Sequence, residues 1–278
     1  MALQIPELKS IFKHSSAVDA GGGKERIGQS TVIVALDGTG DTDNIQEGID
    51  LLPITGGVVF IKEGTYNITE EILISYDNIA LQGTGYGTKI ETNTAGIKLI
   101  KCVGADYTTI RDIQLDGNSV SAAIIWLETS DNCIVEGCFI HHGNNAIYQW
   151  GTSHNNSIIN NKIDTFTISA IELNSGGDRT IIIGNTITGA GLYGMWIASG
   201  DYCVINGNNI SGCTRSAIFG STSYSAIIGN VCTGNTTYGI ELDSGDKNII
   251  TNNILYDNTT AGYLNSGTNT QIGHNITS

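Results

Sequence analysis

The sequence predicts an all-β protein: a single-stranded, right-handed parallel β-helix with about 23 residues per coil, three short strands per coil and an N-terminal capping helix. Three observations lead to this class. The chain has 36 glycines but only 2 prolines, which is typical of short strands joined by tight turns. A small residue followed by an apolar one recurs every 22 to 24 residues in the second half of the chain. Asparagines recur in phase with it.

The chain is expected to form one continuous domain behind an N-terminal extension. We assign residues 1–31 to the extension, 32–105 to the cap helix and the first irregular coils, and 106–278 to the regular coils.

The expected cap is a short helix near residue 45. The run DTDN supplies N-cap side chains, and Ile45, Ile49 and Leu52 follow a helical spacing that ends before Pro53. The open end of a solenoid exposes its core and its strand edges, so a helix at this place is expected to cover that end.

Two rows of residues mark the regular coils. One period reads as a strand of the GIEL type, a turn, a second strand, an asparagine-containing turn and a third strand. Coils stacked ~4.8 Å apart would let an asparagine amide bond to the amide in the next coil, which makes an asparagine ladder. The small-residue row is Ala123, Ala146, Ala170, Gly194, Ala217, Gly239 and Gly262, and the asparagine row is Asn161, Asn185, Asn208, Asn230 and Asn253.

Composition and charge limit the classes of molecule that the protein is expected to bind. The formal net charge is −14 and no cluster of Lys or Arg appears, so nucleic acid is not expected as a partner. No apolar run is long enough for a membrane span or a signal peptide, so we expect no membrane partner. If the protein is extracellular or virion-associated, either its export signal was removed or the protein is released by cell lysis. The six cysteines lack zinc-ligand spacing and are predicted to be buried free thiols.

The segment DGTGDTDNIQEGID…GGVVFIKEGTYNI resembles the opening of the pectate-lyase-like right-handed β-helix superfamily, which includes polysaccharide lyases, glycoside hydrolases and phage tailspikes. The resemblance extends from about Val32 to the C-terminus. It implies that the outward face of the GIEL strands forms a glycan groove. The chain lacks the catalytic signatures of polygalacturonases and of alginate epimerases, and noncatalytic members of the superfamily lack them as well.

Period-2 alternation predicts which side chains of the GIEL strands point outward. Aromatic rings and carboxylates alternate there, a combination suited to stacking on sugars and to binding their hydroxyls. We expect Tyr148, Trp150, Trp196, Phe219 and Asn174 to bind substrate. The two predicted outward rows are Ile125, Tyr148, Glu172, Trp196, Phe219, Glu241 and Leu264, and Leu127, Trp150, Asn174, Ala198, Ser221, Asp243 and Ser266.

Four residues on or near this face are catalytic candidates. Glu241 and Asp243 lie two residues apart on one strand, ~6.5–7 Å, near the lower limit for an inverting carboxylate pair. Glu172 would lie three coils from Glu241, ~14 Å, too far to act with it on one bond. The alternative interpretation is that GIELDS is simply one copy of the repeat, because AIELNS resembles it. The superfamily resemblance implies that Arg215 could act as the base of an elimination, whereas a surface ion pair is the simpler interpretation.

No metal-binding residues are assigned from the sequence. Exposed carboxylates could bind Ca²⁺, which is the one cofactor that they suggest. His141 and His142 could be metal ligands or a general base, but neighbouring residues of a strand point to opposite faces, so joint metal binding is not expected.

Three functions remain open from the sequence. The first is an enzyme that binds and cleaves an acidic polysaccharide by lyase or hydrolase chemistry. The second is a noncatalytic glycan-binding protein such as a tailspike module. The third is a structural β-helix whose aromatic side chains are buried in a homo-oligomer, for example a trimer. Coils of nearly constant length argue against deep loops around a substrate.

Overall fold

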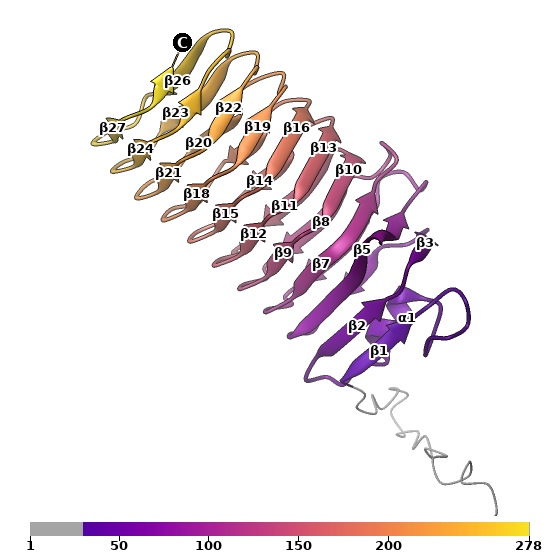
Figure 1. Cartoon of the computed structure of the whole chain (residues 1–278). Helices are drawn as coiled ribbons and strands as arrows, with labels where there is room; N and C mark the ends of the chain where they lie inside the picture. The colour runs from indigo at the N-terminus through magenta and orange to yellow at the C-terminus, as the bar shows by residue number, and fades with distance from the viewer. Residues whose placement is uncertain (1–29, 278) are drawn as a thin grey trace, which may run out of the picture.

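The computed structural model describes residues 30–277, which form one elongated stack of parallel coils (Figure 1). The N-terminal coils lie at one end of the stack and the C-terminal coils at the other. Residues 1–29 lie outside the described residues, so the expected extension 1–31 stays a prediction. Among residues 30–277, no helix is long and apolar enough to cross a membrane.

Three columns of short strands form the walls of the stack. One column is a nine-stranded sheet. Its strands are β4 (Ile72–Ile74), β6 (Lys98–Val103), β8 (Ala123–Glu128), β11 (Asn145–Trp150), β14 (Ile171–Leu173), β17 (Met195–Ile197), β20 (Ile218–Ser221), β23 (Tyr238–Ser244) and β26 (Ala261–Asn265).

The other two columns belong to one 19-stranded sheet, because β5 and β7 are long enough to run through the corner between them. The first half of β7 pairs with β9 and its second half pairs with β10. The strands are β1 (Thr31–Val34), β2 (Gly57–Ile61), β3 (Gly64–Asn67), β5 (Ile79–Glu91) and β7 (Thr109–Asp116); then β9 (Ile134–Glu136), β12 (Ser157–Ile159), β15 (Ile181–Ile183), β18 (Val204–Asn206), β21 (Ala226–Ile228), β24 (Ile249–Thr251) and β27 (Gln271–Gly273); and β10 (Phe139–Gly143), β13 (Lys162–Phe166), β16 (Thr186–Ala190), β19 (Asn209–Ser211), β22 (Val231–Thr233), β25 (Ile254–Leu255) and β28 (Ile276–Thr277).

The register between coils confirms the predicted period. In the nine-stranded sheet each strand pairs in parallel with the strand one coil on, and Ile147 faces Ile171, which faces Met195. These partners are 24 residues apart. The right-handed parallel β-helix predicted from the sequence is therefore confirmed.

Inward side chains of successive coils stack into columns inside the solenoid. One such column is fully buried, and each isoleucine in it contributes about 1.5–3 kcal/mol by leaving water. Close packing also explains the small-residue row, since a Cβ on Gly194 would lie 2.4 Å from Ile210 Cγ2. The buried column is Ile158, Ile182, Ile205, Ile227 and Ile250.

The asparagine row is buried and hydrogen-bonded from coil to coil. Asn208 is typical: its backbone N and its Nδ2 both donate to Asn230 Oδ1, at 3.0 and 2.9 Å. Asn208 Nδ2 also donates to Ile182 O at 2.9 Å, and Asn208 Oδ1 accepts from Asn185 N and Nδ2. One side chain therefore satisfies polar groups of two neighbouring coils. The same pattern of bonds from each residue to the next runs through Asn161, Asn185, Asn208, Asn230, Asn253 and Asn275.

The cysteines are buried free thiols, as predicted. Two of them occupy, in their own coils, the place that an asparagine takes in the next coil. Cys138 N donates to Asn161 Oδ1, and Cys213 N donates to Asn235 Oδ1. Burial raises the pKa of Cys138 and of Cys213 to about 12. These thiols therefore stay protonated at neutral pH.

A short helix forms where the sequence predicted one. Helix α1 (Ile45–Asp50) begins after Asn44, whose side chain accepts from Glu47 N. The Gln46 side-chain amide pairs with both backbone groups of Leu73 at the edge of β4, as the backbone of a neighbouring strand would. Its Oε1 accepts from Leu73 N at 2.7 Å, and its Nε2 donates to Leu73 O at 3.2 Å. The expectation that this helix caps the end of the solenoid is not supported. Strand β1 comes before the helix in the chain, and among the described strands β1 pairs along its length only with β2, so β1 is the first strand of the stack.

Replacing Asn208 by alanine should destabilise the protein strongly. The change removes the acceptor of Asn185 N and the side-chain donor to Ile182 O inside the stack, so we expect the free energy of unfolding to fall by about 2–4 kcal/mol. Urea denaturation followed by circular dichroism measures this. Asn209→Ala is the matched control, because Asn209 is exposed and should change stability by less than about 0.5 kcal/mol. Equal effects of the two variants would contradict the role assigned to the row.

The six thiols should not react with a disulfide reagent in the folded protein at pH 8, because the thiolate is the reactive form and burial disfavours it. After denaturation in guanidinium all six should react. Fast labelling of the native protein would show that the coils open locally around these residues.

Candidate functional site

The outward side of the nine-stranded sheet carries one continuous row of side chains, each in register with the next. We call this row, together with Trp150 and Asn174 beside it, the aromatic face. The inward neighbours of these residues, such as Ile171 and Leu173, are fully buried as the alternation predicted. The row is Trp126, Tyr148, Glu172, Trp196, Phe219, Glu241 and Leu264.

The sequence-based assignment at the start of this row was wrong by one residue. Tyr148 pairs with Trp126, so Ile125 and Leu127 point inward and are buried. The preceding coil is one residue shorter than we counted, which reverses the face of every side chain. The alternation of apolar and larger side chains in AIIWLE, compared with NAIYQW, is the signal that could have identified Trp126.

Three aromatic side chains form the first cluster on the face. Trp126 stacks on Tyr148 with ring centroids 4.4 Å apart, and Trp150 lies 6.3 Å from Tyr148. Trp150 is 43% exposed. Two lysines lie beside the cluster: Lys98 Nζ is 5.1 Å from the centre of the Trp126 ring, and Lys101 precedes Trp126 in the row. Both lysines are ion-paired, Lys98 with Glu71 at 3.5 Å and Lys101 with Glu128 at 3.4 Å, so the cluster offers ring surface to solvent beside two ion pairs.

A second cluster lies two strands further along the axis. Trp196 and Phe219 are half-buried, and Tyr193 stacks on Phe219 with ring centroids 4.4 Å apart. Arg215 Nη1 donates to Tyr193 Oη at 2.6 Å, so its guanidinium is held by a phenol, whereas the sequence suggested a carboxylate. Sequence reasoning missed Tyr193; its position before the small residue Gly194 matches that of Tyr238 before Gly239.

Glu172 lies between the two clusters and is almost covered, with only 4% of its surface exposed. Asn145 Nδ2 donates to its Oε2 at 3.0 Å, and Asn174 Nδ2 lies 3.3 Å from its Oε1 and 2.7 Å from Tyr148 Oη. Burial raises the pKa of Glu172, and the hydrogen bonds from the two amides oppose this rise. A carboxyl group with a raised pKa can serve as a proton donor.

The structure does not bring the other candidates to Glu172. Glu241 lies three strands away in the row, where it accepts a hydrogen bond from the Ser216 hydroxyl. Asp243 is exposed and lies in a β-bulge, because Ser221 pairs with Ser244. The predicted place of Asp243 beside Ser221 is therefore wrong.

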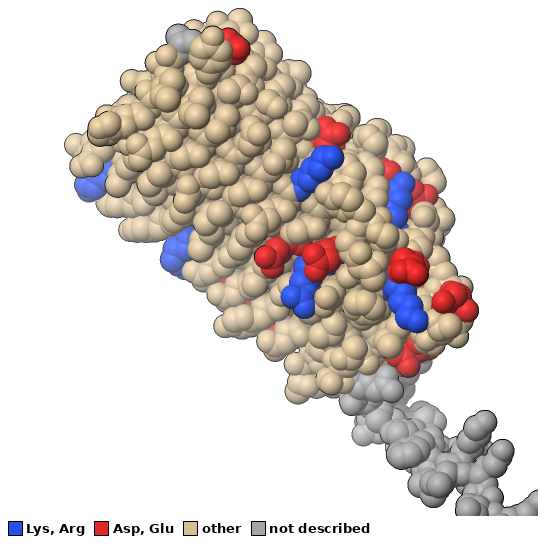
Figure 2. All heavy atoms as spheres, viewed as in Figure 1, with Lys and Arg blue, Asp and Glu red and all other residues tan. Residues whose placement is uncertain are grey.

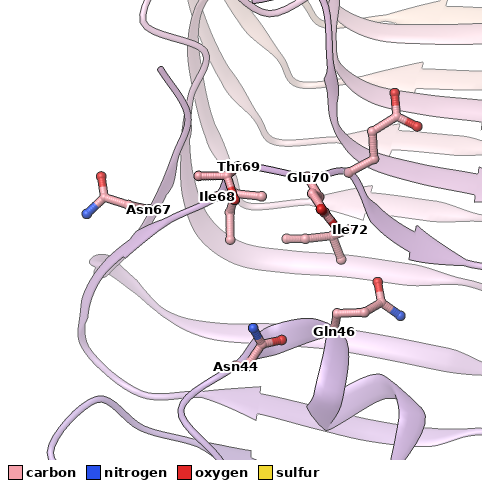
Figure 3. A pocket seen from close by; sticks show the side chains of 8 residues that line it. Asn44, Gln46, Asn67, Ile68, Thr69, Glu70 and Ile72 are labelled. Atoms are coloured by element: carbon pink, nitrogen blue, oxygen red, sulfur yellow. The ribbon is translucent and has the colours of Figure 1, made fainter. Parts of the chain in front are cut away.

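Two other surface features differ in chemistry from the aromatic face. A hollow of about 160 Å³ lies between α1 and the turn before β4 (Figure 3), and the residues that line it include no aromatic ring, imidazole or thiol. Figure 2 shows one side of the molecule, where lysines and arginines are scattered among acidic residues and form no large basic patch.

The two adjacent histidines do not point to opposite faces, so that expectation was wrong. His142 has φ 57°, a left-handed conformation that interrupts the alternation of β10. As a result His141 Nδ1 and His142 Nδ1 lie 2.9 Å apart, and His142 Nδ1 lies 3.1 Å from Asp116 Oδ1. We call Asp116, His141 and His142 the histidine cluster.

Comparisons with known proteins agree with the fold. A mannuronan C-5 epimerase A-module from Azotobacter vinelandii superposes with a TM-score of 0.70 at 16% identity, over 79% of this chain and 68% of that one. ORF18 of Geobacillus virus E2 superposes with a TM-score of 0.60 at 16% identity, over 91% of this chain and 59% of that one. At such identities the likeness shows the fold alone.

Sequence comparison gives one curated relative and one family. Pectinesterase 2 of Citrus sinensis is 36% identical over 86 residues, which are 30% of this chain and 15% of that protein. The family model described as "Periplasmic copper-binding protein (NosD)" matches residues 70–277. Because this match covers about three quarters of the chain, the protein belongs to the NosD family.

Proposed function

We propose that the aromatic face binds an extended polysaccharide chain that lies along the axis of the solenoid. One observation carries this proposal: two aromatic clusters lie in the same row of the sheet, in register with each other. Between them lies the Glu172 carboxyl group, with the side-chain amides of Asn145 and Asn174 bonded to it. Aromatic rings stack on the apolar faces of sugars, and a few fixed polar groups give orientation and specificity.

The spacing of the coils supports a repeating ligand. Successive strands lie ~4.8 Å apart, similar to the length of one sugar unit, so Tyr148 and Trp196 would contact sugars two positions apart. Between them, the half-buried Asn174 can exchange hydrogen bonds with sugar hydroxyls, whereas the buried Asn145 amide is bonded to Ser169 O and Glu172. A shallow face without long loops suits a polymer that extends beyond the contact.

An acidic polysaccharide is the more specific form of the proposal. Arg215, which is hydrogen-bonded to Tyr193, lies beside the second cluster and can attract carboxylates of a ligand against the overall charge of −14. Lys98 and Lys101 lie beside the first cluster, where each is ion-paired with a glutamate that a ligand carboxylate would have to replace. The names of the epimerase and the pectinesterase refer to mannuronan and pectin, which makes polymannuronate and polygalacturonate the first probes. Ca²⁺ should be included as a bridging ion.

Cleavage by hydrolase or lyase chemistry is the further step of the same proposal. Among the four candidates, Glu172 has the environment of a general acid, whereas hydrolysis requires a second carboxylate or a bound water near it. The noncatalytic alternative, a glycan-binding module of the tailspike type, needs only the face itself. Assaying new reducing ends and the ultraviolet absorbance of unsaturated sugars distinguishes hydrolysis, elimination and binding alone.

The family description also names the periplasm and copper. A site of action outside the cytoplasm fits a polysaccharide ligand, and we include an extracellular, periplasmic or virion-associated location in the proposal. The aromatic face itself does not suit copper, because its row offers carboxylates and rings but no imidazole or thiolate.

Replacing Trp196 by alanine should weaken binding of the polysaccharide at least tenfold, a loss of about 1.4 kcal/mol, because it removes stacking surface between Tyr148 and Phe219. Isothermal titration calorimetry with polymannuronate and polygalacturonate measures this. Tyr224→Ala is the control, since Tyr224 is 46% exposed but stacks on Tyr202 away from the face.

If Trp196→Ala and Tyr224→Ala bind as the unchanged protein does, the aromatic face is not the binding site. If no polysaccharide binds and the protein sediments as a trimer or another homo-oligomer, the face is an interface between subunits instead.

The raised pKa of Glu172 should make stability depend on pH. Its protonated form is favoured in the folded state, so this stabilising contribution is complete below the unfolded-state pKa of about 4.3 and is lost as pH rises through the higher folded-state pKa. Urea denaturation of the protein and of Glu172→Gln across pH 4 to 8 tests this. The difference in unfolding free energy should shift in favour of the glutamine variant with rising pH, and parallel profiles would contradict the assignment.

A further inference from the structure

We propose that Asp116, His141 and His142 form a binding site for a divalent transition-metal ion, with Cu²⁺ bound more tightly than Zn²⁺. The site lies at the corner where β7 ends and β10 runs beside it, apart from the aromatic face.

The backbone brings the three side chains together from neighbouring coils. Asp116 is the last residue of β7 and is in register with His141 of β10. His142 would point away in a regular strand, but its φ of 57° turns its ring to the side of His141. A non-glycine residue in this conformation has a backbone cost, and here it gives the cluster its third member.

The distances within the cluster match those between the ligands of a metal ion. The three facing atoms, Asp116 Oδ1 and the two histidine Nδ1 atoms, are separated by 2.9, 3.1 and 3.5 Å. In a tetrahedral site with bonds of about 2.0–2.1 Å, ligand atoms lie about 3.3–3.4 Å apart. Three corners of such a site are therefore nearly in place, and the fourth is left for water or another ligand.

Hydrogen bonding accounts for Asp116 Oδ1, which also accepts from Asn118 N at 3.0 Å, but not for the close approach of the two histidine nitrogens. The Asp116 carboxylate can only accept, and two Nδ1–H groups at 2.9 Å would point their hydrogens at each other. The two nitrogens can hydrogen-bond to each other only when exactly one of them carries a proton. A metal cation in the same space accepts electron density from all three.

Neighbouring residues hold the cluster in a ligand-like arrangement. Gln114 Nε2 lies 3.0 Å from His141 Nε2, and the opposite amide orientation would place Oε1 there to accept the Nε2–H of a metal-bound histidine. Phe139 stacks on the His141 ring at 4.4 Å and fixes its plane. Lys89 Nζ binds Asp116 Oδ2 at 2.9 Å, so that Oδ1 remains directed at the histidines.

The site is buried on one side and open on the other. The side chains of His141 and Asp116 are 8% and 6% exposed, whereas that of His142 is 43% exposed. A metal ion can therefore enter past His142 without opening a coil. Lys89 places one positive charge nearby, but Glu91, 2.6 Å from Lys89 Nζ, compensates for it.

The ligand types determine which ions fit. Two imidazoles and one carboxylate suit Zn²⁺ and Cu²⁺, while Mg²⁺ and Ca²⁺ prefer all-oxygen sites. Affinity for a given nitrogen and oxygen site is higher for Cu²⁺ than for Zn²⁺, which gives the order stated in the proposal.

The test is metal titration of the protein purified without a polyhistidine tag. Isothermal titration calorimetry with Cu²⁺ and with Zn²⁺ should give one tight equivalent, and the electron paramagnetic resonance spectrum of the Cu²⁺ form should show nitrogen ligands. His142→Ala should weaken binding at least tenfold. Because His142 is the most exposed member of the cluster, this variant is expected to fold, which circular dichroism checks. Asp116→Asn should also weaken binding, and His142→Ala decides the question if Asp116→Asn does not fold.

His154→Ala is the matched control, because His154 also faces an aspartate, with its Nδ1 3.9 Å from Asp178 Oδ2, but has no second histidine beside it. This variant should bind the metal as the unchanged protein does. A melting temperature that rises with Cu²⁺ in the unchanged protein and in His154→Ala, but not in His142→Ala, would give independent support.

The proposal is overturned if the unchanged protein binds neither ion, or if His142→Ala binds both as tightly as His154→Ala does. Tighter binding of Zn²⁺ than of Cu²⁺ would overturn the stated preference.

Discussion

Hydrogen bonding between successive coils is the constraint on which the whole structure depends. A parallel solenoid must satisfy the backbone at each turn as well as in its strands, and a buried unpaired group there would cost about 1–3 kcal/mol. The asparagine row satisfies these turns, since Asn208 alone bonds to groups in two neighbouring coils. Each coil is thereby held in one register with the next.

This fixed register converts a repeating sequence into rows of aligned side chains. On the nine-stranded sheet the result is the aromatic face, where residues about 23 apart in sequence lie side by side. The repeat determines where each outward position lies but leaves its side chain free to vary. Tyr148, Glu172 and Trp196 can therefore differ in chemistry while they occupy equivalent places.

The histidine cluster has the opposite origin, because it depends on a departure from the repeat. The left-handed backbone at His142 breaks the alternation of β10 and places two neighbouring imidazoles on one side, next to Asp116 of the preceding coil. The protein thus offers two surfaces with different chemistry: aromatic rings and amides along one sheet, and nitrogen and oxygen ligands at one corner.

The sequence by itself determined the solenoid, its period, the asparagine row, the buried thiols and most of the outward row, because each of these is set by spacing along the chain. It could not determine what depends on local irregularities. One short coil reversed the assignment of Ile125 and Trp126, a bulge displaced Asp243, and one left-handed residue joined His141 to His142.

The environments of the site residues likewise required the tertiary structure. Glu172 and Glu241 occupy equivalent positions in similar motifs, yet Glu172 is covered by Asn145 and Asn174, whereas Glu241 bonds to Ser216. Burial and hydrogen bonding come from neighbouring coils, and a repeat pattern does not specify which side chains those coils bring. The sequence therefore determined where most of the outward row lies, and only the folded stack decided which of its residues contact one another.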